Sequence, residues 1–305
     1  MRNWFRATFV AVAALAAAFG VCAVPRNAQA QTTAASAGNS GPTAILLPGH
    51  PGFHASLNAH FRGVENVPGF ARIEPYLALL QNTSAHAVLA YAIEWKLGLA
   101  NGSQKTISAI VIPPPGAKWA LSGQEPLIEP HDWLLVSPFF HWNSAEFQGL
   151  LNTKTAEGQF QSALSSPRIS GNQGWPTVDP SLDGAVFADG TFIGPDTLKL
   201  FEQYQATQKA EFEEGEWVLA QFSKPGGADE LDLATVFRNQ IRAGSAPLFG
   251  PAPSFYNAAR GQQAERLLDC LRKKGRKALR ALSVRLTFST PLPLRRAAVS
   301  APQTP

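Results

Sequence analysis

The chain has 305 residues, of which 45% are hydrophobic and 16% are charged, and its formal net charge is +4 at pH 7. Its two cysteines are Cys22 and Cys270, and the first lies in a segment that we expect to be removed. One remaining cysteine excludes an intramolecular disulfide, so the fold must depend on a hydrophobic core. The chain is long enough for one core, or for one core with a smaller unit beside it.

The N-terminus has the layout of a secretory signal peptide. Arg2 and Arg6 precede an apolar run from Ala7 to Val24, and Ala28 and Ala30 place small residues where a signal peptidase reads the chain. We therefore expect export, with cleavage near Ala30 leaving the protein periplasmic or extracellular. A retained membrane anchor is the alternative, because the apolar run has about the minimum length for a span.

The charge that remains after export is unevenly distributed. The signal segment carries Arg2, Arg6 and Arg26 and no acid, so the rest of the chain is close to neutral. Residues 260–305 hold eleven Lys or Arg and two acids, whereas residues 31–259 have an acidic excess. Asymmetry of this kind indicates either an anionic partner or two parts of one protein that neutralise each other.

Residues 31–43 are small and polar and predict a flexible linker, and the pattern from 44 to 195 is mostly that of β-strands. In AVLAYAIEWKL, residues 87–97, large apolar side chains alternate with small or charged ones, which is typical of a strand with one face toward a core. We expect it to pair with a strand at 76–81 through a polar turn. Further short strands are expected at 106–112 and 133–140.

The stretch LDGAVFADGTFIGPD, residues 182–196, holds three aspartates among glycines. A calcium loop is one interpretation, but Asp183, Asp189 and Asp196 are spaced too widely for an EF-hand. Asp189-Gly190 is instead favoured at the centre of a two-residue type I′ hairpin, which would place Phe187 opposite Phe192. We predict a hairpin here and no metal.

Two blocks of the chain, LQNTSAHAVLAYAIEW and LDGAVFADGTFIGPD, resemble a group of uncharacterised exported bacterial proteins. The shared features are an N-x-S…AYxxxW strand pair and a DGxVFxDGTFxGPD segment. The resemblance implies an export signal and an immunoglobulin-like β-sandwich with appended helices. It implies no activity, because that group has no assigned chemistry.

The pattern becomes helical after Ile193. Asp196 is predicted to cap a first helix that reaches about Phe222, a second helix is expected at 229–242, and Ser254 is predicted to cap a third that reaches about Leu286. The last segment holds four prolines and is expected to be disordered. The fold class is thus α+β, an Ig-like antiparallel β-sandwich followed by a small helical unit. The predicted organisation is a signal peptide at 1–30, a linker at 31–43, a β-sandwich at 44–195, a helical region at 196–287 and a disordered tail at 288–305.

The third helix is strongly basic over residues 264–286. A helix with one apolar and one cationic face can lie on an anionic membrane surface or bind a polyanion such as envelope polysaccharide. In the alternative interpretation, its apolar stripe packs on the acidic helices and its cations meet Glu211–Glu216 and Asp229–Asp232. That alternative accounts for both signs of charge at once.

Two sets of side chains are candidates for chemistry. His50, His54 and His60 lie close together in HPGFHASLNAH, and imidazoles are zinc and copper ligands, but no HExxH motif or cysteine partner accompanies them. Pro51 and Gly52 make a helix through this segment unexpected. The acidic run Glu211–Glu216 would supply carboxylates for glycoside cleavage, although charge runs are usually solvated faces. We expect Cys270, among leucines, to be a buried inert thiol.

The sequence has no GxSxG elbow, P-loop, GxGxxG or CxxC motif, and we predict no cofactor. We favour an exported non-catalytic interaction module, with another envelope protein or polysaccharide as partner and no specific nucleic acid. One alternative is a motif-free hydrolase or metal-binding protein that uses the His50/His54/His60 region. Another is an anionic membrane-surface or polyanion binder that uses the basic helix 264–286.

Overall fold

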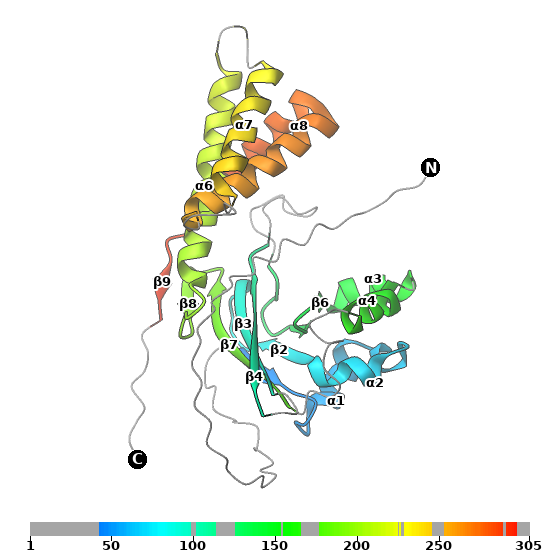
Figure 1. The fold of residues 1–305 in the computed structure, drawn as a ribbon. Coiled ribbons are helices and arrows are strands. Elements are labelled where there is room, and N and C mark those ends of the chain that lie inside the picture. The colour runs from blue at the N-terminus through cyan, green and yellow to red at the C-terminus, as the bar shows by residue number, and fades with distance from the viewer. Residues whose placement is uncertain are drawn as a thin grey trace. The chain divides into compact units, whose positions relative to one another are not determined.

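The computed structural model shows a mixed α+β fold with two sheets (Figure 1). The predicted signal peptide and residues 31–42 of the predicted linker lie outside the residues that the structure describes. No helix within the described residues is long and apolar enough to cross a membrane. The described residues are 43–98, 102–113, 126–153, 155–165, 177–224, 226, 229–245, 253–288 and 291–297.

Each sheet combines strands that are consecutive in the chain with strands that are distant in sequence. The first has the order β1 (Thr43–Leu46), β2 (Ala78–Asn82), β5 (Trp133–Val136), β6 (His141–Asn143). The second has the order β4 (Gln104–Val111), β3 (Val88–Gly98), β7 (Thr177–Phe187), β8 (Thr191–Ile193), β9 (Arg295–Arg296). Several strands were predicted close to their observed positions, but apart from the hairpin at Asp189-Gly190 their partners were not.

The predicted pairing of the strands at 76–81 and 87–97 is wrong, because β2 and β3 belong to different sheets. Asn82 is fully buried and organises the connection between them. Its amide donates to the His86 carbonyl at 2.8 Å, and its Oδ1 accepts the Ser84 N–H at 3.0 Å. The loop that these hydrogen bonds close leads from β2 to β3 in the second sheet. There the main chain of Val88 forms hydrogen bonds with Ile128 and not with β2.

Strand β3 confirms the predicted alternation in its second half, where Trp95 and Leu97 are buried and Lys96 is exposed. Its first half is buried on both faces, since Ala90 and Ala92 are as inaccessible as their larger neighbours. Small side chains on the second face therefore mark close packing and not exposure to solvent.

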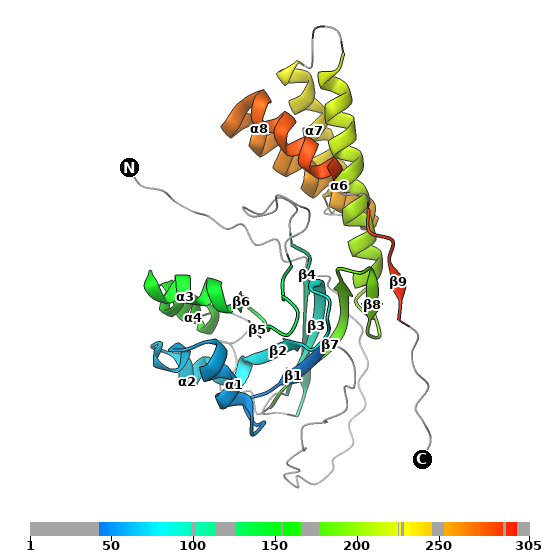
Figure 2. The same cartoon turned by 180° about the vertical axis from the view of Figure 1, so that it is seen from behind.

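Contacts divide the chain into two compact units, residues 1–80, 94–110 and 135–181, and residues 81–93, 111–134 and 182–305. The first unit contains helices that the β-rich interpretation of residues 44–195 did not predict (Figure 2). They are α1 (Phe53–His60), η1 (Val64–Asn66), α2 (Phe70–Ile73), η2 (Glu74–Tyr76), α3 (Ser144–Asn152) and α4 (Thr155–Leu164).

An aromatic cluster forms the core of this first unit. Trp142 stacks on Phe140 with 4.1 Å between ring centroids, and lies 5.5 Å from both Phe147 and Phe160. Its indole N–H donates to Gln159 at 3.0 Å, so the one polar atom of the ring is satisfied. The cluster joins β6 to α3 and α4, and explains why these short helices are stable although their own sequences are weakly amphipathic.

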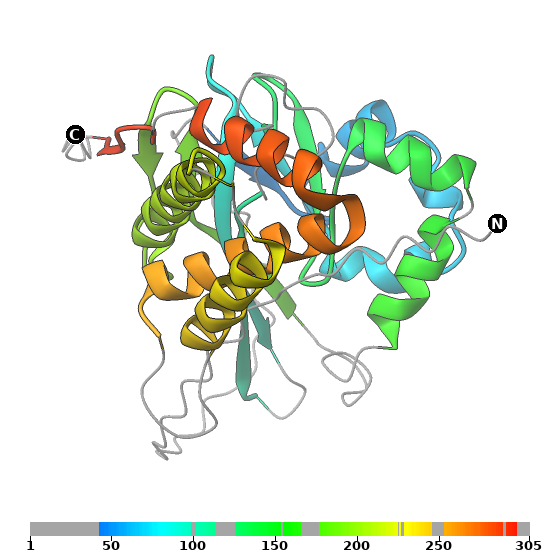
Figure 3. The same ribbon diagram turned by 90° about the horizontal axis from the view of Figure 1, so that it is seen from above.

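The second unit contains three helical elements, α6 (Leu200–Phe222), α7 (Glu230–Gly244) and α8 (Phe255–Phe288). Ser254 caps the start of α8, as predicted, and Asp229 caps α7. The third helix is not continuous, because Gly275 has φ 74° and ψ −177°. Figure 3 shows α8 as two separate rods joined at this break.

A leucine-rich core joins these helices. Gly244 of α7 and Gly261 of α8 lie so close that a Cβ on Gly244 would come within 2.8 Å of the Gly261 Cα. Both segments of α8 contribute to the core, so the break at Gly275 lets one helix cover two faces of the bundle. The core residues are Val218, Leu233, Phe237, Ala264, Leu267, Leu268, Leu271, Leu279 and Leu286.

Candidate functional site

The predicted histidine cluster does not assemble as a metal site. His50 accepts the Gly52 N–H at 3.0 Å, outside α1, and only His54 and His60 lie on that helix. His54 instead contacts two carboxylates, Glu65 at 2.9 Å and Glu74 at 3.2 Å. Among the residues that the structure describes, no group of three His, Cys, Asp or Glu side chains is arranged to hold a metal ion.

Hydrogen bonds from His54 and Asn58 lower the pKa of the Glu65 carboxyl. Asn58 donates its amide to Glu65 at 2.9 Å, and the contact strengthens the charged form of the acid. This network ties α1 to η1. A helix does form here, contrary to our expectation, and it begins at Phe53, directly after the Pro51-Gly52 pair.

The hairpin between β7 and β8 exists, but its predicted register is wrong by one residue. Val186 pairs with Phe192 and Ala185 with Ile193. A type I′ turn needs positive φ at both central residues. Of Asp189 and Gly190, only Gly190 has a positive φ, at 84°. The Gly190 N–H bonds to the Phe187 carbonyl at 2.9 Å, which gives a three-residue loop with Gly190 in the left-handed position.

The three aspartates of this stretch each hold a different piece of backbone. Asp189 accepts the Thr191 N–H at 2.9 Å and its hydroxyl at 2.7 Å, which closes the loop. Asp183, which is buried, accepts the N–H groups of Thr197 and Leu198 at 2.9 and 2.8 Å. The hydrogen bonds from Thr191 lower the pKa of Asp189 against the opposing effect of burial, and His86 and Arg295 add to them.

The first helix of this unit begins at Leu200 and not at Asp196, because these aspartates organise a turn before it. Asp196 has a positive φ of 61°, donates its N–H to the Asp183 carbonyl, and accepts the Phe201 N–H at 3.1 Å. The Asp196 side chain therefore still caps the helix, but the helix begins about one turn later than predicted.

A C-terminal strand lies against this hairpin, where we expected a disordered tail from residue 288. Within residues 291–297, Arg295–Arg296 form β9 and pair in parallel with β8, in the register Thr191↔Arg295 and Phe192↔Arg296. Arg295 reaches Asp189 at 3.3 Å, and Arg296 reaches Asp196 at 2.6 Å. The high proline content of this tail is compatible with disorder and equally with an extended strand at a sheet edge. Local composition does not distinguish the two.

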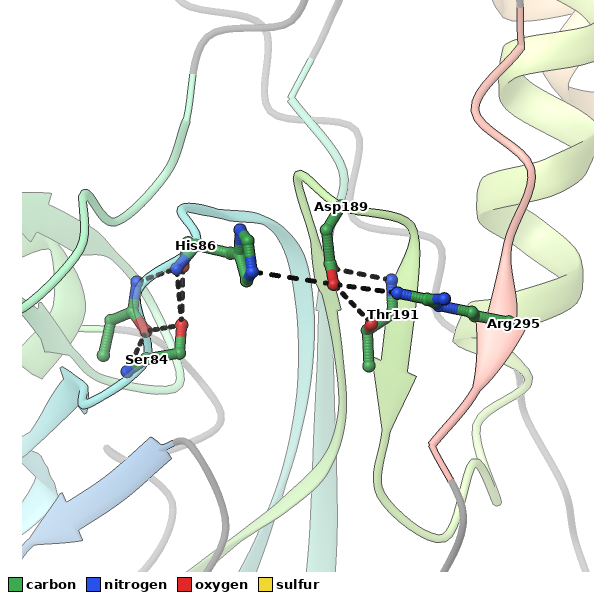
Figure 4. Close-up of polar contacts among 6 residues, drawn as sticks. Ser84, His86, Asp189, Thr191 and Arg295 are labelled. Carbon is green, nitrogen blue, oxygen red and sulfur yellow. Dashed lines mark hydrogen bonds and ion pairs between the residues drawn. The ribbon is translucent and has the colours of Figure 1, made fainter.

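Ser84, His86 and Asp189 lie together beside the hairpin and include the residue types of a catalytic triad (Figure 4). His86 Nε2 is 3.8 Å from Asp189 Oδ2. The Ser84 hydroxyl, however, bonds to Asn82 Oδ1 at 2.7 Å and to the main-chain carbonyl of His86 at 2.6 Å, not to the imidazole. A nucleophile needs a base at its hydroxyl, so this arrangement stabilises a turn and does not form a triad.

The acidic run of α6 faces α7 and α8 at its buried positions. Glu214 is 1% exposed and accepts hydrogen bonds from Arg260 at 2.5 Å and Gln240 at 3.0 Å. Its second carboxylate oxygen and the Gln240 carbonyl oxygen have no hydrogen-bond partner in the described part of the chain. The charge of Glu214 therefore depends on Arg260 for most of its compensation.

Glu211 lies one turn before Glu214 and is also buried. Desolvation raises its pKa to about 8, and Arg266, 4.0 Å away, offsets this only in part. Glu213 accepts the Tyr256 hydroxyl, and Glu216 is exposed, so neighbouring glutamates do not form a facing pair for glycoside cleavage. Trp217 packs on Phe237 at 5.9 Å, in the core.

The predicted contact of the basic helix with acidic side chains of α6 is observed for its two most N-terminal cations. Arg260 and Arg266 meet Glu214 and Glu211, as the packing interpretation required. Near and beyond the break at Gly275, the one ion pair with an acid in the described part of α8 is that of Lys273 with Asp269, within the same helix, at 2.9 Å. Arg272, Lys277, Arg280 and Arg285 are exposed and form no ion pair within the described residues.

We call the cationic surface the set of exposed side chains on and beside the second rod of α8. Arg276 lies 5.5 Å from the Phe222 ring and the others face solvent. Cys270, on the first rod, is half-buried and not fully buried as expected, and desolvation raises its pKa, which disfavours a reactive thiolate. The cationic surface consists of Arg272, Lys273, Lys274, Arg276, Lys277, Arg280 and Arg285.

Comparison of the chain with protein families, with characterised proteins and with solved structures gives no match. Function is therefore inferred from the charge, exposure and contacts of the chain's own residues.

Proposed function

We propose that the protein is an exported, non-catalytic interaction module that binds an anionic lipid surface through the cationic surface of α8. The observation that supports this most directly is the contrast within α8. Arg260 and Arg266, near the start of the helix, contact the buried Glu214 and Glu211, whereas the cations of the second rod have no internal counter-charge among the described residues. Unneutralised exposed cations on one helix favour an anionic partner.

Apolar side chains on the same rod favour a lipid surface over a dissolved polyanion. Val284 is 36% exposed and Phe288 is 79% exposed. Residues 277, 281, 284 and 288 follow helical spacing, so Lys277, Val284 and Phe288 share one face. An interfacial helix places such apolar groups at the headgroup boundary while its cations contact the phosphates.

Export is the second part of the proposal and is supported by the charged, apolar and small-residue pattern of residues 1–30. It predicts that the protein recovered outside the cytoplasm begins at Gln31, which mass spectrometry of its N-terminal peptide would establish. Recovery of the intact N-terminus would contradict cleavage and would favour the retained anchor.

The immunoglobulin-like arrangement of the strand-rich part also belongs to the proposal. Support for it comes from the presence of two separate sheets, of four and five strands. An experimentally determined structure of the exported chain tests it, since a sandwich requires the two sheets to pack face to face at about 10 Å.

Sedimentation with vesicles tests lipid binding. We expect the full-length protein to co-sediment with vesicles containing anionic lipid and not with purely zwitterionic vesicles, and to be released by salt. Lys277→Glu/Arg280→Glu should weaken binding at least about tenfold, since each cation near the surface contributes about 1 kcal/mol. The matched control is Arg238→Glu/Arg242→Glu, which makes the same charge change on the exposed side of α7.

The two double variants have identical net charge, so a difference between them must come from position. An equal loss of vesicle binding in both variants would show that binding depends on overall charge alone. That result would contradict a site on α8. Absence of binding by the unaltered chain at low salt would reject the proposal outright.

A further inference from the structure

The exposed edge of β8 is occupied by the chain's own C-terminal segment, in the manner of a bound peptide. The Arg295 N–H donates to the Gly190 carbonyl at 2.9 Å, and the Ala297 N–H donates to the Phe192 carbonyl at 2.8 Å. Main-chain bonds of this kind are how an added strand binds a sheet edge, while side chains at alternate positions provide specificity.

Both arginines of the segment enter contacts that fit a guanidinium. Arg296 bonds to Asp196, whose side chain is 2% exposed, and its guanidinium carbon lies 5.1 Å from the Phe192 ring and 4.7 Å from the Phe201 ring. Arg295 bonds to Asp189 at the rim. A buried carboxylate with two aromatic rings selects arginine over lysine, because only a planar guanidinium can bond and stack at once.

The receptor groups are held in place without the tail. Asp196 is fixed by the Asp183 carbonyl and the Phe201 N–H, and Asp189 by Thr191. Phe192 and Phe201 contact each other edge to face at 5.4 Å. All of these contacts lie within residues 183–201, so the binding groups are preorganised.

The C-terminal segment that contains β9, in contrast, is held weakly. β9 is two residues long, and the side chains of Arg295 and Arg296 are 72% and 52% exposed. Few contacts and high exposure give a segment a low free energy of local opening. The tail occupies the edge largely because it is tethered to it, at the high effective concentration of an intramolecular ligand.

We propose that the edge of β8, with Asp189, Asp196, Phe192 and Phe201, is a binding site for an extended segment of a partner protein that carries two consecutive arginines. The partner segment runs parallel to β8 and replaces Arg295–Arg296, which serve as the resident internal ligand. This site is separate from the cationic surface of α8 and does not depend on lipid binding.

Displacement by a peptide in trans tests the site on the full chain. The probe is a fluorescent peptide with the sequence PLPLRRA, that of residues 291–297, and the readout is anisotropy. We expect Arg295→Ala/Arg296→Ala to bind it at least about tenfold more tightly than the unaltered chain, since the internal competitor is weakened. A PLPLKKA peptide should bind several-fold more weakly than the arginine peptide.

Arg296→Ala leaves the buried Asp196 carboxylate without its cation, so a second variant protects the test against misfolding. Arg295→Ala/Arg296→Lys keeps a charge at Asp196 and removes the stacked guanidinium, and it should show the same gain in peptide binding. Adding Asp189→Asn to this variant should reverse part of the gain, because the rim carboxylate is lost.

Three outcomes would overturn the proposal. A folded Arg295→Ala/Arg296→Lys chain that binds no peptide would make β9 a purely structural strand. Equal binding of the arginine and lysine peptides would reduce the effect to charge. A dimer of the unaltered chain that disappears in the variants would assign the edge to exchanged tails of two copies instead of a different partner.

Discussion

The two rods of α8 are both rich in cations but differ in what those cations contact. The first places Arg260 and Arg266 against buried glutamates of α6, and the second presents its cations to solvent. The helix is broken at Gly275, and beyond the break Leu279 and Leu286 still reach the core while the cations stay exposed. A basic amphipathic pattern therefore does not by itself distinguish an internal counter-charge from a binding surface.

The largest effect in this comparison should come from Arg260→Met. It leaves Glu214 buried with one amide donor, and breaking a buried pair on one side costs about 3 kcal/mol of folding free energy. The control is Arg285→Met on the second rod, for which we expect about 0.5 kcal/mol or less. Chemical denaturation measures both, and similar losses would erase the distinction between the rods.

Glu211 should make stability depend on pH in the sense opposite to that of a typical carboxylate. Its folded pKa of about 8 exceeds its unfolded value, so its favourable contribution is complete below the unfolded pKa and is lost as pH rises toward 8. We expect a decrease of about 3–4 kcal/mol between pH 5 and 8. Glu211→Gln should flatten this slope, whereas the exposed Glu216→Gln should leave it unchanged.

The break at Gly275 is the next test. Its φ and ψ lie in a region that is essentially restricted to glycine, and Gly275→Ala should cost about 1–3 kcal/mol through backbone strain alone, since no atom lies within 4 Å of an added Cβ. Gly158→Ala, in α4 with equally open surroundings, should instead stabilise by about 0.5–1 kcal/mol. A neutral Gly275→Ala in thermal unfolding would mean that the two rods can merge into one helix.

The smallest effect on stability should come from the cationic surface itself. Lys277→Glu/Arg280→Glu should change the free energy of unfolding by about 0.5 kcal/mol or less, because both side chains are exposed and unpaired with any acid in the described chain. The same protein should lose vesicle binding. A strong destabilisation would show that these cations have an internal structural role after all.

Local signals in the sequence predicted much of the second unit. Ser254 caps the third helix and the second helix begins next to Asp229 as expected, and the Asp189-Gly190 pair does mark a hairpin. The register of that hairpin was wrong because Asp189 closes a three-residue loop with its side chain, and turn type depends on a φ that composition does not determine. The capping role of Asp196 was displaced for a similar reason, since Asp183 binds the intervening N–H groups.

The helices of the first unit were missed because their stability is not local. α1 to α4 are short, and α3 and α4 are supported by the aromatic cluster around Trp142, whose members come from positions 140 to 160. Isolated helices of this length are marginal, so tertiary packing overrides weak propensity. The histidines appeared as a cluster in sequence, yet in the structure His54 contacts Glu65 and Glu74, and His50 accepts the Gly52 N–H.

The sequence by itself determined the α+β class, the positions of most strands and of the three C-terminal helices, and the uneven distribution of charge. These properties depend on periodicity, capping and turn residues, which act over a few positions. Only the tertiary structure decided which strands share a sheet, which cations of α8 are neutralised, and that Arg296 returns to Asp196 across 100 residues of sequence. Those outcomes depend on contacts between distant segments, whose burial and geometry no local pattern specifies.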